Sequence, residues 1–336
     1  MAPIGMILSA GFGTRLKPFT ELRPKPLMEI GGKPIIYHLI RMLERAGVEE
    51  IILNLHYLPE QIQTYINNNP FKARIHMVIE QSILGTAGGV KNALNSLNVQ
   101  PNSMILMHGD ILCDIDLNSY GLEDALCMLI CEKNRSIAEY EGSVGVDKHG
   151  RIVVLGKFFQ SSSPPVEQGF FTGIQYLSQQ ALRLIQQSSH ESLVRDIYPL
   201  WLKQGHAVSA RMVPLVYEDL GSAPRIFQAN MHVLKNHDHF QHINFLDGFQ
   251  KIDTDIFVGK NVVIDKKSRL VGPLMIADNT HLAANTTIGP NVVIGEQCLI
   301  EQHAVVKNSV VMSSTTIEKM TPLDCILALS SARVKV

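Results

Sequence analysis

A glycine-rich stretch near the start of the chain carries four basic residues among prolines and threonines. The stretch SAGFGTRLKPFTELRPKPL covers residues 9–27 and contains Arg15, Lys17, Arg23 and Lys25. Glycines have no side chain, so backbone N–H groups can approach an anionic ligand closely. Arginine can bind phosphate oxygens through two parallel hydrogen bonds, and lysine supplies a point charge. The pattern therefore predicts a polyphosphate site in which Arg15 and Lys25 carry the positive charge.

This stretch differs from the two commonest phosphate-binding loops. The Walker A pattern G-x-x-x-x-G-K-[ST] is absent from it. The dinucleotide-binding fingerprint is also absent, because Leu16 stands where the third glycine would be. The stretch therefore predicts a polyphosphate site of a third kind.

Alternating segments in the first half of the chain predict the scaffold that positions this loop. In KPIIYHLIRMLERAG, apolar residues at 35, 36, 39, 40 and 43 form one helical face, with Pro34 in the first turn and Gly47 at the end. The alternation of strands and helices predicts an α/β, Rossmann-like domain with a mostly parallel sheet. The expected strands are 4–10, 50–55, 73–80, 103–110 and 125–131, and the further helices are 59–68 and 86–97.

A six-residue period governs the C-terminal part. From Val258, ten consecutive hexads each open with an aliphatic residue or Met. This period is typical of a parallel β-helix, and three hexads per turn would give a little over three coils of the left-handed form. The segment 324–330 would cap the last coil. We therefore expect a catalytic domain at 1–236, a connector at 237–251 and a β-helix with its cap at 252–336.

The loop resembles the signature of the sugar-1-phosphate nucleotidyltransferases, also called nucleotide-sugar pyrophosphorylases. GFGTRLKPFTELRPKPL holds every fixed position of G-x-G-T-R-L-x-P-x-T followed by P-K-P. EQSILGTAGGVKNAL (80–94), HGDIL (108–112) and YEDLGSAPRIFQAN (217–230) are similar to three further family segments, in the same order. A β-helix after the catalytic domain is common in this family, notably in mannose-1-phosphate guanylyltransferases and ADP-glucose pyrophosphorylases.

The resemblance implies that an NTP and a sugar 1-phosphate react to give an NDP-sugar and pyrophosphate. It implies Mg²⁺ as the cofactor, with Asp110 and Asp219 as its ligands, because magnesium prefers carboxylate oxygens. Asp110 follows an apolar strand, at the sheet edge where open α/β folds bind ligands. The implied catalytic residues are Arg15, Lys25 and Asp110. The implied nucleotide-binding residues are Ala10, Gly11, Gly13, Thr14, Glu80, Gly85, Thr86 and Gly88.

The sugar-phosphate residues match the family less closely. Lys157 is kept from an E-K-P motif, but Gly156 and Phe158 replace its neighbours. FFTGIQYLS (170–178) resembles a family strand that would place Thr172 and Gly173 at the sugar. Around Asp219, the usual W-x-D-x-G-T-P-E reads YEDLGSAP.

The bulk composition excludes several classes of protein. The formal net charge is -1, so no overall basic field indicates nucleic acid or an acidic membrane surface. No apolar run approaches the roughly 20 residues of a membrane span, and MAPIGMILSAG lacks the basic start of a signal peptide. Five cysteines without C-x-x-C pairs favour free thiols in the cytoplasm. The flat faces of the β-helix favour a homo-oligomer.

Several readings of the function stay open. Overall architecture favours mannose-1-phosphate guanylyltransferase, whose signature usually reads L-A-G-G. Here Ala10 stands in LSAG, closer to the L-A-A-G of many uridylyltransferases, and NLHYLPEQI (54–62) resembles N-acetylmuramate-1-phosphate uridylyltransferases. A UTP enzyme for an N-acetylated sugar such as MurNAc or GlcNAc 1-phosphate is therefore the alternative. A non-catalytic regulatory paralogue and a β-helix acyltransferase, with His281 or His303 as base, are further classes. The intact Arg15, Lys25, Asp110 and Asp219 favour an active nucleotidyltransferase.

Overall fold

The computed structural model describes residues 3–122, 124–133, 142–189 and 191–336. The chain forms two compact units. The sheet unit consists of Met1–Phe12 and Leu39–Tyr217, and the β-helix unit of Gly13–His38 and Glu218–Val336. The signature loop is thus divided: its first residues belong to the sheet unit, and residues from Gly13 onward belong to the β-helix unit.

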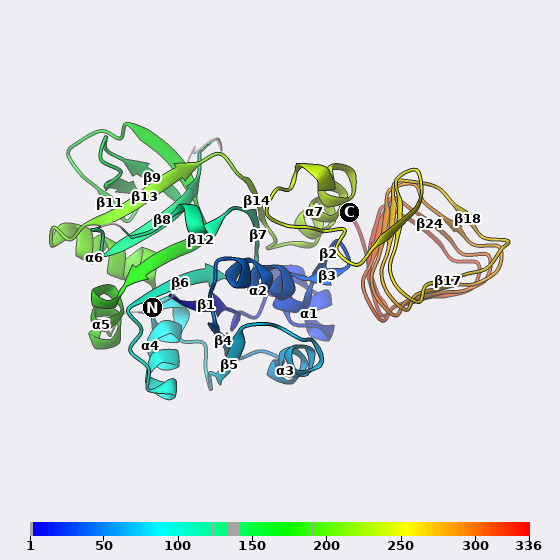
Figure 1. The fold of residues 1–336 in the computed structure, drawn as a ribbon, viewed down its shortest axis with the longest axis horizontal. Helices are drawn as coiled ribbons and strands as arrows, with labels where there is room; N and C mark the ends of the chain where they lie inside the picture. Colours follow the sequence, from blue (N-terminus) through cyan, green and yellow to red (C-terminus); the bar gives the residue numbers. More distant parts are fainter. Residues whose placement is uncertain (1–2, 123, 134–141, 190) are drawn as a thin grey trace. The chain divides into compact units, whose positions relative to one another are not determined.

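Four parallel strands form one half of the central sheet in the sheet unit. Their order is β6-β1-β4-β5, so the first strand of the chain lies in the interior (Figure 1). β1 is apolar and buried between two parallel neighbours, as expected for an inner strand of a parallel sheet. The predicted strands are confirmed to within a few residues. Their bounds are β1 Ile4–Leu8, β4 Glu50–Leu55, β5 Arg74–Ile79 and β6 Ser103–His108.

Mostly antiparallel strands form the other half, so the sheet as a whole is mixed. β12 pairs antiparallel with β6, β8 and β9, and β13 pairs parallel with β8. A short two-stranded sheet joins β7 to β14. The bounds are β7 Ile111–Asp114, β8 Cys127–Glu132, β9 Ser143–Val146, β10 Ile152–Leu155, β11 Phe159–Gln160, β12 Glu167–Ser178, β13 Val208–Val213 and β14 Val216–Asp219.

Helices α4 and α5 lie side by side against this sheet (Figure 1). Their apolar faces bury Ala93, Leu94 and Leu182 on strand residues such as Met6 and Leu106. The helices predicted at 35–43, 59–68 and 86–97 are confirmed. No helix within the described ranges is both long and apolar enough to cross a membrane. The bounds are α1 Phe19–Leu22, α2 Ile35–Arg45, α3 Pro59–Asn68, α4 Gly85–Leu97, α5 Gln179–Gln187, α6 Tyr198–Lys203 and α7 Ala223–Asn236.

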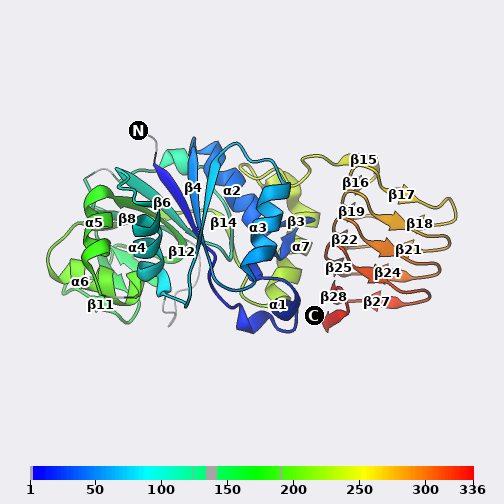
Figure 2. The same cartoon turned by 90° about the horizontal axis from the view of Figure 1, so that it is seen from below.

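The β-helix unit contains three stacked parallel sheets, the arrangement expected of a left-handed β-helix (Figure 2). One sheet has five parallel rungs, β16-β19-β22-β25-β28, and β15 and β29 close its two edges antiparallel. The other two sheets have four strands each, so the stack exceeds the little over three coils that the hexads predicted. The segment predicted as a cap supplies the last rung. The bounds are β2 Glu29–Ile30, β3 Lys33–Pro34, β15 Gln250–Asp253, β16 Ile256–Val258, β17 Val263–Ile264, β18 Arg269–Leu270, β19 Leu274–Ile276, β20 His281–Leu282, β21 Thr287–Ile288, β22 Val292–Ile294, β23 Leu299–Ile300, β24 Val305–Lys307, β25 Ser309–Val311, β26 Thr316–Ile317, β27 Pro322–Asp324, β28 Ile326–Leu329 and β29 Ala332–Lys335.

The predicted six-residue period fails at the tenth hexad, which would begin at Met312. Ile294 pairs with Val311, which is 17 residues on, whereas Ile276 pairs with Ile294, which is 18 residues on. Val311 therefore belongs to the interior of the stack in place of the predicted Met312. The turn before β25, where Asn308 has a positive φ of 43°, is one residue shorter than the earlier turns.

One outer face of the β-helix is apolar and buried. Along the five-rung sheet, residues that point away from the stack interior have at most 6% of their surface exposed. Helix α7 packs against β22 and β25 of this sheet. On the neighbouring sheet the equivalent Val263 is 57% exposed, so this face alone is covered. The covered residues are Phe257, Met275, Val293, Val310 and Leu327.

All five cysteines are free thiols, and four of them are buried. Burial raises the pKa of Cys127 and Cys298 to about 12, and raises those of Cys113 and Cys131 further. Only Cys325 is partly exposed. A buried, protonated thiol is a poor nucleophile.

We therefore expect native protein at pH 8 to react with one equivalent of an aromatic disulfide reagent, and denatured protein with five. Burial raises the pKa values of the four thiols in the folded state only. The free energy of unfolding should therefore also fall as the pH rises from 9.0 towards 12. Absorbance at 412 nm follows the reaction, for which a Cys325→Ser variant is the control. More than one fast equivalent from native protein would contradict the burial.

Candidate functional site

The signature loop folds into two short 3₁₀ turns in the β-helix unit. Gly13 has φ +63° and begins the first turn, and the Thr20 hydroxyl donates to its carbonyl at 3.1 Å. A Cβ on Gly13 would lie 3.1 Å from the Cβ of Lys25, so a side chain there would crowd the lysine. Lys25 begins the second turn, Lys25–Leu27, between Pro24 and Pro26. The Lys25 side chain is therefore held in a rigid and mostly buried position, with 8% of its surface exposed.

Arg15 and Asp219 lie on either side of Gly221 in the same unit. A Cβ on Gly221 would lie 2.7 Å from an Arg15 nitrogen and 2.8 Å from Asp219 Oδ1. Gly221 N donates to Asp219 Oδ1 at 2.9 Å, and Arg225 forms an ion pair with Oδ2. The structure thus brings together two segments that the sequence analysis had matched separately. They form a small cluster of two guanidinium groups and one carboxylate.

In the sheet unit, Glu80 is buried and joins three strand ends. Its Oε1 accepts from the Asn54 amide at 2.7 Å, and Asn54 Oδ1 accepts from Ser9 N at 2.9 Å. Oε2 accepts from Leu84 N at 3.3 Å. This network orders the backbone of Ala10 and Gly11 after β1 relative to the loop before α4. A role for Glu80 in positioning these loops follows directly from the contacts.

The segment 191–193 covers the first turn of α4, at the predicted nucleotide loop. Gly85 has φ +74°, and a Cβ there would lie 2.6 Å from Glu191 O. Ala87 N donates to that same oxygen at 2.8 Å, and Leu193 N donates to Thr86 Oγ1 at 2.9 Å. Gly85 and Thr86 therefore hold the covering segment in place. Gly88, one turn further, would contact only Leu84 if it carried a Cβ.

Asp110 lies in the turn between β6 and β7 and is partly exposed. The preceding Gly109 N donates to Leu8 O at 2.9 Å, which fixes the turn at the carboxyl end of β1. Beside it, Gly173 has φ +88°, and a Cβ there would meet the His108 ring at 2.8 Å. Asp110 and Gly173 therefore both adjoin the end of β6.

The Thr172 side chain is bonded within the sheet. Its side chain is fully buried, and its hydroxyl donates to Ile130 O at 2.9 Å and accepts from Ile174 N at 3.3 Å. The hydroxyl therefore supports the irregular part of β12, where the pairing with β8 shifts register.

Lys157 lies apart from the strand ends that hold Asp110. It is exposed in the turn between β10 and β11, with its ammonium 5.6 Å from the Phe158 ring centroid. Two strands, β9 and β12, separate β10 from β6 in the sheet.

Asp110 in the sheet unit and Asp219 in the β-helix unit each offer carboxylate oxygens of the kind that magnesium prefers. Asp110 and Asp219 are partly exposed carboxylates, and magnesium is commonly held by one or two such groups together with substrate phosphates. Among the described residues there is no group of three or more His, Cys, Asp or Glu side chains that could hold a metal ion.

Sequence reasoning missed Asn54, Gly89, Glu191 and Arg225. A Cβ on Gly89 would lie 2.9 Å from the Asn54 amide and 3.0 Å from Glu80 Oε1, so the second glycine of TAGG serves the Glu80 network. That doubled glycine was a signal that the sequence offered. Glu191 acts through its backbone carbonyl, so its side-chain type carries no signal.

Comparison with known proteins finds relatives that are named as sugar-1-phosphate nucleotidyltransferases. A UTP–glucose-1-phosphate uridylyltransferase from Synechocystis is 28% identical over 305 residues, 81% of this chain and 77% of that protein. A mannose-1-phosphate guanyltransferase from Candida albicans is 28% identical over 208 residues, 60% of this chain and 56% of that protein.

Among solved structures, HddC from Yersinia pseudotuberculosis complexed with GMP-PN has a TM-score of 0.55 and 27% identity, covering 68% of this chain and 98% of that one. The GMPPB C-terminal domain model matches residues 270–333. The nucleotidyl transferase model matches residues 4–236, well over half of the chain. The chain therefore belongs to the nucleotidyl transferase family, as an enzyme of the sugar-1-phosphate type.

Proposed function

We propose that the enzyme makes GDP-mannose and pyrophosphate from GTP and mannose 1-phosphate. The observation that carries the choice of substrates is the match of residues 270–333 to the GMPPB C-terminal domain. Several relatives named mannose-1-phosphate guanyltransferase support it. The product is expected to form in the cytoplasm, as the composition predicts.

The proposed reaction is an in-line displacement at the α-phosphorus. An oxygen of the sugar phosphate forms a bond to this phosphorus, and the bond to the β-phosphate oxygen breaks, so pyrophosphate leaves with the electron pair. Such a transfer needs positioning and charge stabilisation more than covalent help from the protein. Lys25 is assigned the α-phosphate and the incoming sugar phosphate. Arg15 is assigned the leaving pyrophosphate.

The other roles are proposed from the resemblance to the family. Gly11, Gly13 and Thr14 are assigned to the phosphates through their backbone groups. Ala10, Gly85 and Gly88, with Thr86 and Glu80 ordering their loops, offer contacts to the base and ribose. Gly173 and Lys157 are assigned to the sugar phosphate.

Asp110 and Asp219 are assigned to the metal. When bound, Mg²⁺ would neutralise charge on the phosphate oxygens. Arg225, which pairs with one oxygen of Asp219, orients that carboxylate through a second contact besides the backbone of Gly221.

A UTP-dependent enzyme is the second candidate, because a specific residue and a relative favour it. Ala10 stands where guanylyltransferases usually have glycine, and the Synechocystis relative is a uridylyltransferase. The sugar would then be glucose 1-phosphate or an N-acetylated sugar 1-phosphate.

A grid of substrates tests the proposal. Pyrophosphate release would be measured for five nucleoside triphosphates against mannose, glucose, N-acetylglucosamine and N-acetylmuramate 1-phosphates, with Mg²⁺. We expect the strongest turnover for GTP with mannose 1-phosphate. Turnover confined to UTP would support the second candidate, and a blank grid from folded protein would support the regulatory paralogue.

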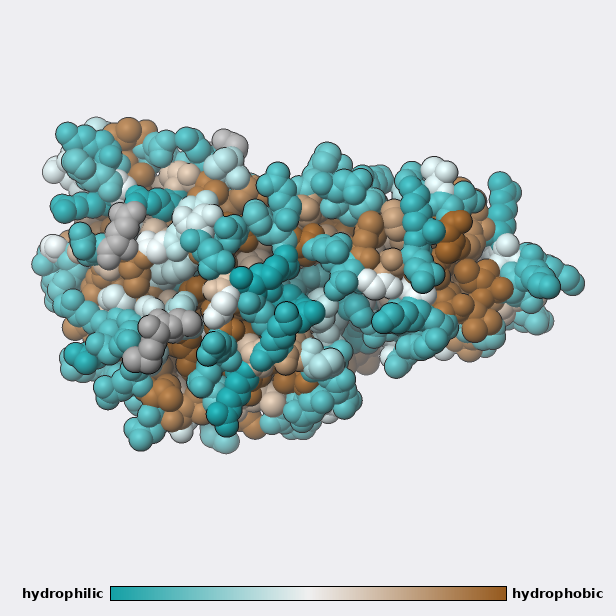
Figure 3. Space-filling view, viewed as in Figure 1, coloured by the Kyte–Doolittle hydropathy of each residue, from teal (hydrophilic) through white to brown (hydrophobic). Residues whose placement is uncertain are grey.

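We also propose that the β-helix pairs two copies of the enzyme. Its first coil ends the stack, so Ile264 and Leu270 are only partly buried, whereas Leu282 and Ile288 one coil further are fully buried. Figure 3 shows hydrophobic residues at the end of the β-helix that faces the viewer. Light scattering on the purified protein would give the mass of the particle in solution. A mass equal to that of one chain would contradict the proposal.

A further inference from the structure

A buried ion pair joins the signature loop to the β-helix. Glu29 has 3% of its surface exposed and pairs with Arg23 through Oε1. Its Oε2 accepts from Ser313 N at 2.9 Å, and an Arg23 nitrogen donates to Ser313 O at 2.8 Å. One backbone position of the β-helix is thus bonded to both charges of the pair.

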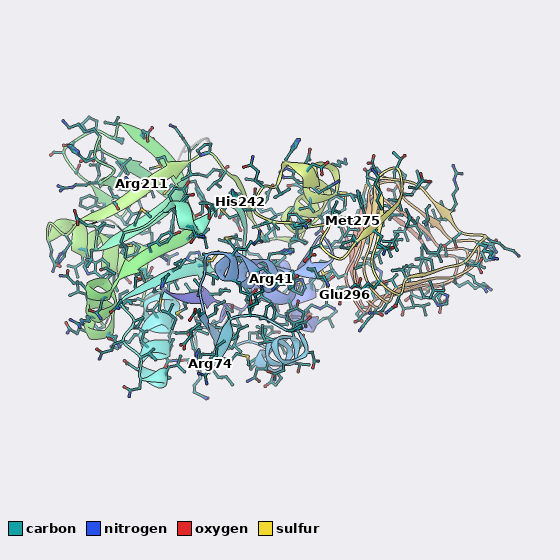
Figure 4. The ribbon with its side chains drawn as sticks, viewed as in Figure 1. Arg41, Arg74, Arg211, His242, Met275 and Glu296 are labelled. Carbon is teal, nitrogen blue, oxygen red and sulfur yellow. The ribbon has the colours of Figure 1, made fainter. Side chains whose placement is uncertain are left out.

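The β-helix is shaped to admit this carboxylate. Gly295 lies against it: a Cβ there would be 2.5 Å from Glu29 Oε2. Any larger residue would therefore displace the carboxylate or the backbone of Ser313. One coil before Ser313, Glu296 forms a second ion pair between the two segments, with Lys33. Figure 4 shows Met275 and Glu296 on this side of the β-helix.

Arg23 and Glu29 enclose the lysine of the signature. Arg23 precedes Pro24 and Lys25, and Glu29 follows Leu27 and Met28, so the ion pair closes a short loop around the 3₁₀ turn. Within the loop, Leu27 N donates to Pro24 O at 2.9 Å and Met28 N to Lys25 O at 3.0 Å. The two prolines leave little backbone freedom. The orientation of the whole turn is therefore set by where its two ends are fixed.

We propose that Arg23 and Glu29 are positioning residues for Lys25, and that Ser313 of the β-helix fixes both of them. This inference rests on the proposed function, in which Lys25 holds the α-phosphate. The β-helix is then part of the apparatus that orients the nucleotide. A misplacement of about 1 Å in such a group can lower the rate by as much as a hundredfold.

The test is a double-mutant cycle between Glu29→Gln and Lys25→Met. Glutamine keeps the size of Glu29 but removes its charge, so the loop is loosened without leaving an unpaired carboxylate. The readouts are kcat and the dissociation constant of the nucleoside triphosphate that wild type uses, measured by calorimetry. The dissociation constant stays measurable when turnover is lost. Glu296→Gln, which removes the charge that pairs with Lys33 but leaves the Arg23–Glu29 pair in place, is the matched control.

We expect Glu29→Gln to lower kcat by about ten- to a hundredfold and to weaken nucleotide binding. In the Lys25→Met background it should change the dissociation constant no further, because its effect passes through that lysine. Arg23→Lys, which keeps the charge, should retain more activity than Arg23→Met. Glu296→Gln should behave as wild type.

Other results would distinguish the role assigned to Lys25 from the positioning role of Arg23 and Glu29. If Lys25→Met binds and turns over nucleotide as wild type does, the role assigned to Lys25 fails. If Lys25→Met is impaired but Glu29→Gln is not, or if the two effects multiply, the positioning role fails while the role of Lys25 stands. Thermal unfolding of each variant shows whether a loss of activity or binding is caused by unfolding of the protein. If Glu29→Gln does not fold, the cycle is run with Arg23→Met, under the same criteria.

Discussion

Replacing Asp110 by asparagine is expected to lower kcat by about a thousandfold or more while the protein stays folded. Asparagine has the same size and keeps one carbonyl oxygen, but it removes the charge that would bind Mg²⁺. Loss of a metal ligand removes several kcal/mol of charge stabilisation from the transition state. Because Asp110 is partly exposed in a turn, the fold does not depend on burying it. Pyrophosphate release across a Mg²⁺ titration measures the effect.

Asp116→Asn is the matched control for this experiment. Asp116 begins the 3₁₀ turn Leu117–Ser119, where its carboxylate accepts from Asn118 N at 3.0 Å and from the Ser119 hydroxyl at 2.9 Å. Asparagine is also a good capping residue, so we expect little change in stability and none in kcat. Turnover of Asp110→Asn at the wild-type rate would show that the metal assignment is wrong. Calorimetric titration of Mn²⁺ into Asp110→Asn and wild type would then show whether Asp110 contributes to ion binding at all.

Much of the fold could be predicted from the sequence, because both domains are periodic. Apolar spacing identified α2 and the strands around β1, and the hexads identified the β-helix. These patterns report which side chains point inward, and inward burial is what the hydrophobic effect rewards. The one-residue shift that places Val311 in the interior could not be predicted. The shorter turn still leaves an apolar residue, Met312, at the position that the period expects.

The candidate site was predictable where the signature itself makes the contacts. Arg15 and Asp219 were both named, and they do lie around Gly221. The buried bond from the Thr172 hydroxyl to Ile130 O could not be predicted, because no local pattern distinguishes a buried hydroxyl from an exposed one. Contacts between distant segments were missed for a similar reason. Ser313 bonds Glu29 through its backbone, and backbone bonds leave no trace in residue type.

The second large effect concerns the stability of the β-helix, at Gly289. Its φ is +100°, a conformation that residues with a side chain rarely adopt. A Cβ there would overlap the carbonyl oxygen of Val271 in the preceding coil, far inside the 3.0 Å that Cβ atoms normally keep. Gly289 N donates to Val306 O at 2.8 Å, so the coil is held on its other side as well. Alanine would force neighbouring coils apart and break their hydrogen bonds.

We expect Gly289→Ala to lower the free energy of unfolding by about 4 kcal/mol or more. Gly248→Ala separates the two causes, because Gly248 also has a positive φ, +85°, but a Cβ there would meet nothing within 4 Å. That control should cost about 1 kcal/mol, the conformational strain alone. Urea unfolding followed by circular dichroism measures both. Equal losses in the two variants would mean that the coils can separate without cost. If Ser313 fixes Glu29 and Arg23 as proposed, activity should fall in Gly289→Ala before the sheet unit unfolds, and it should persist in Gly248→Ala.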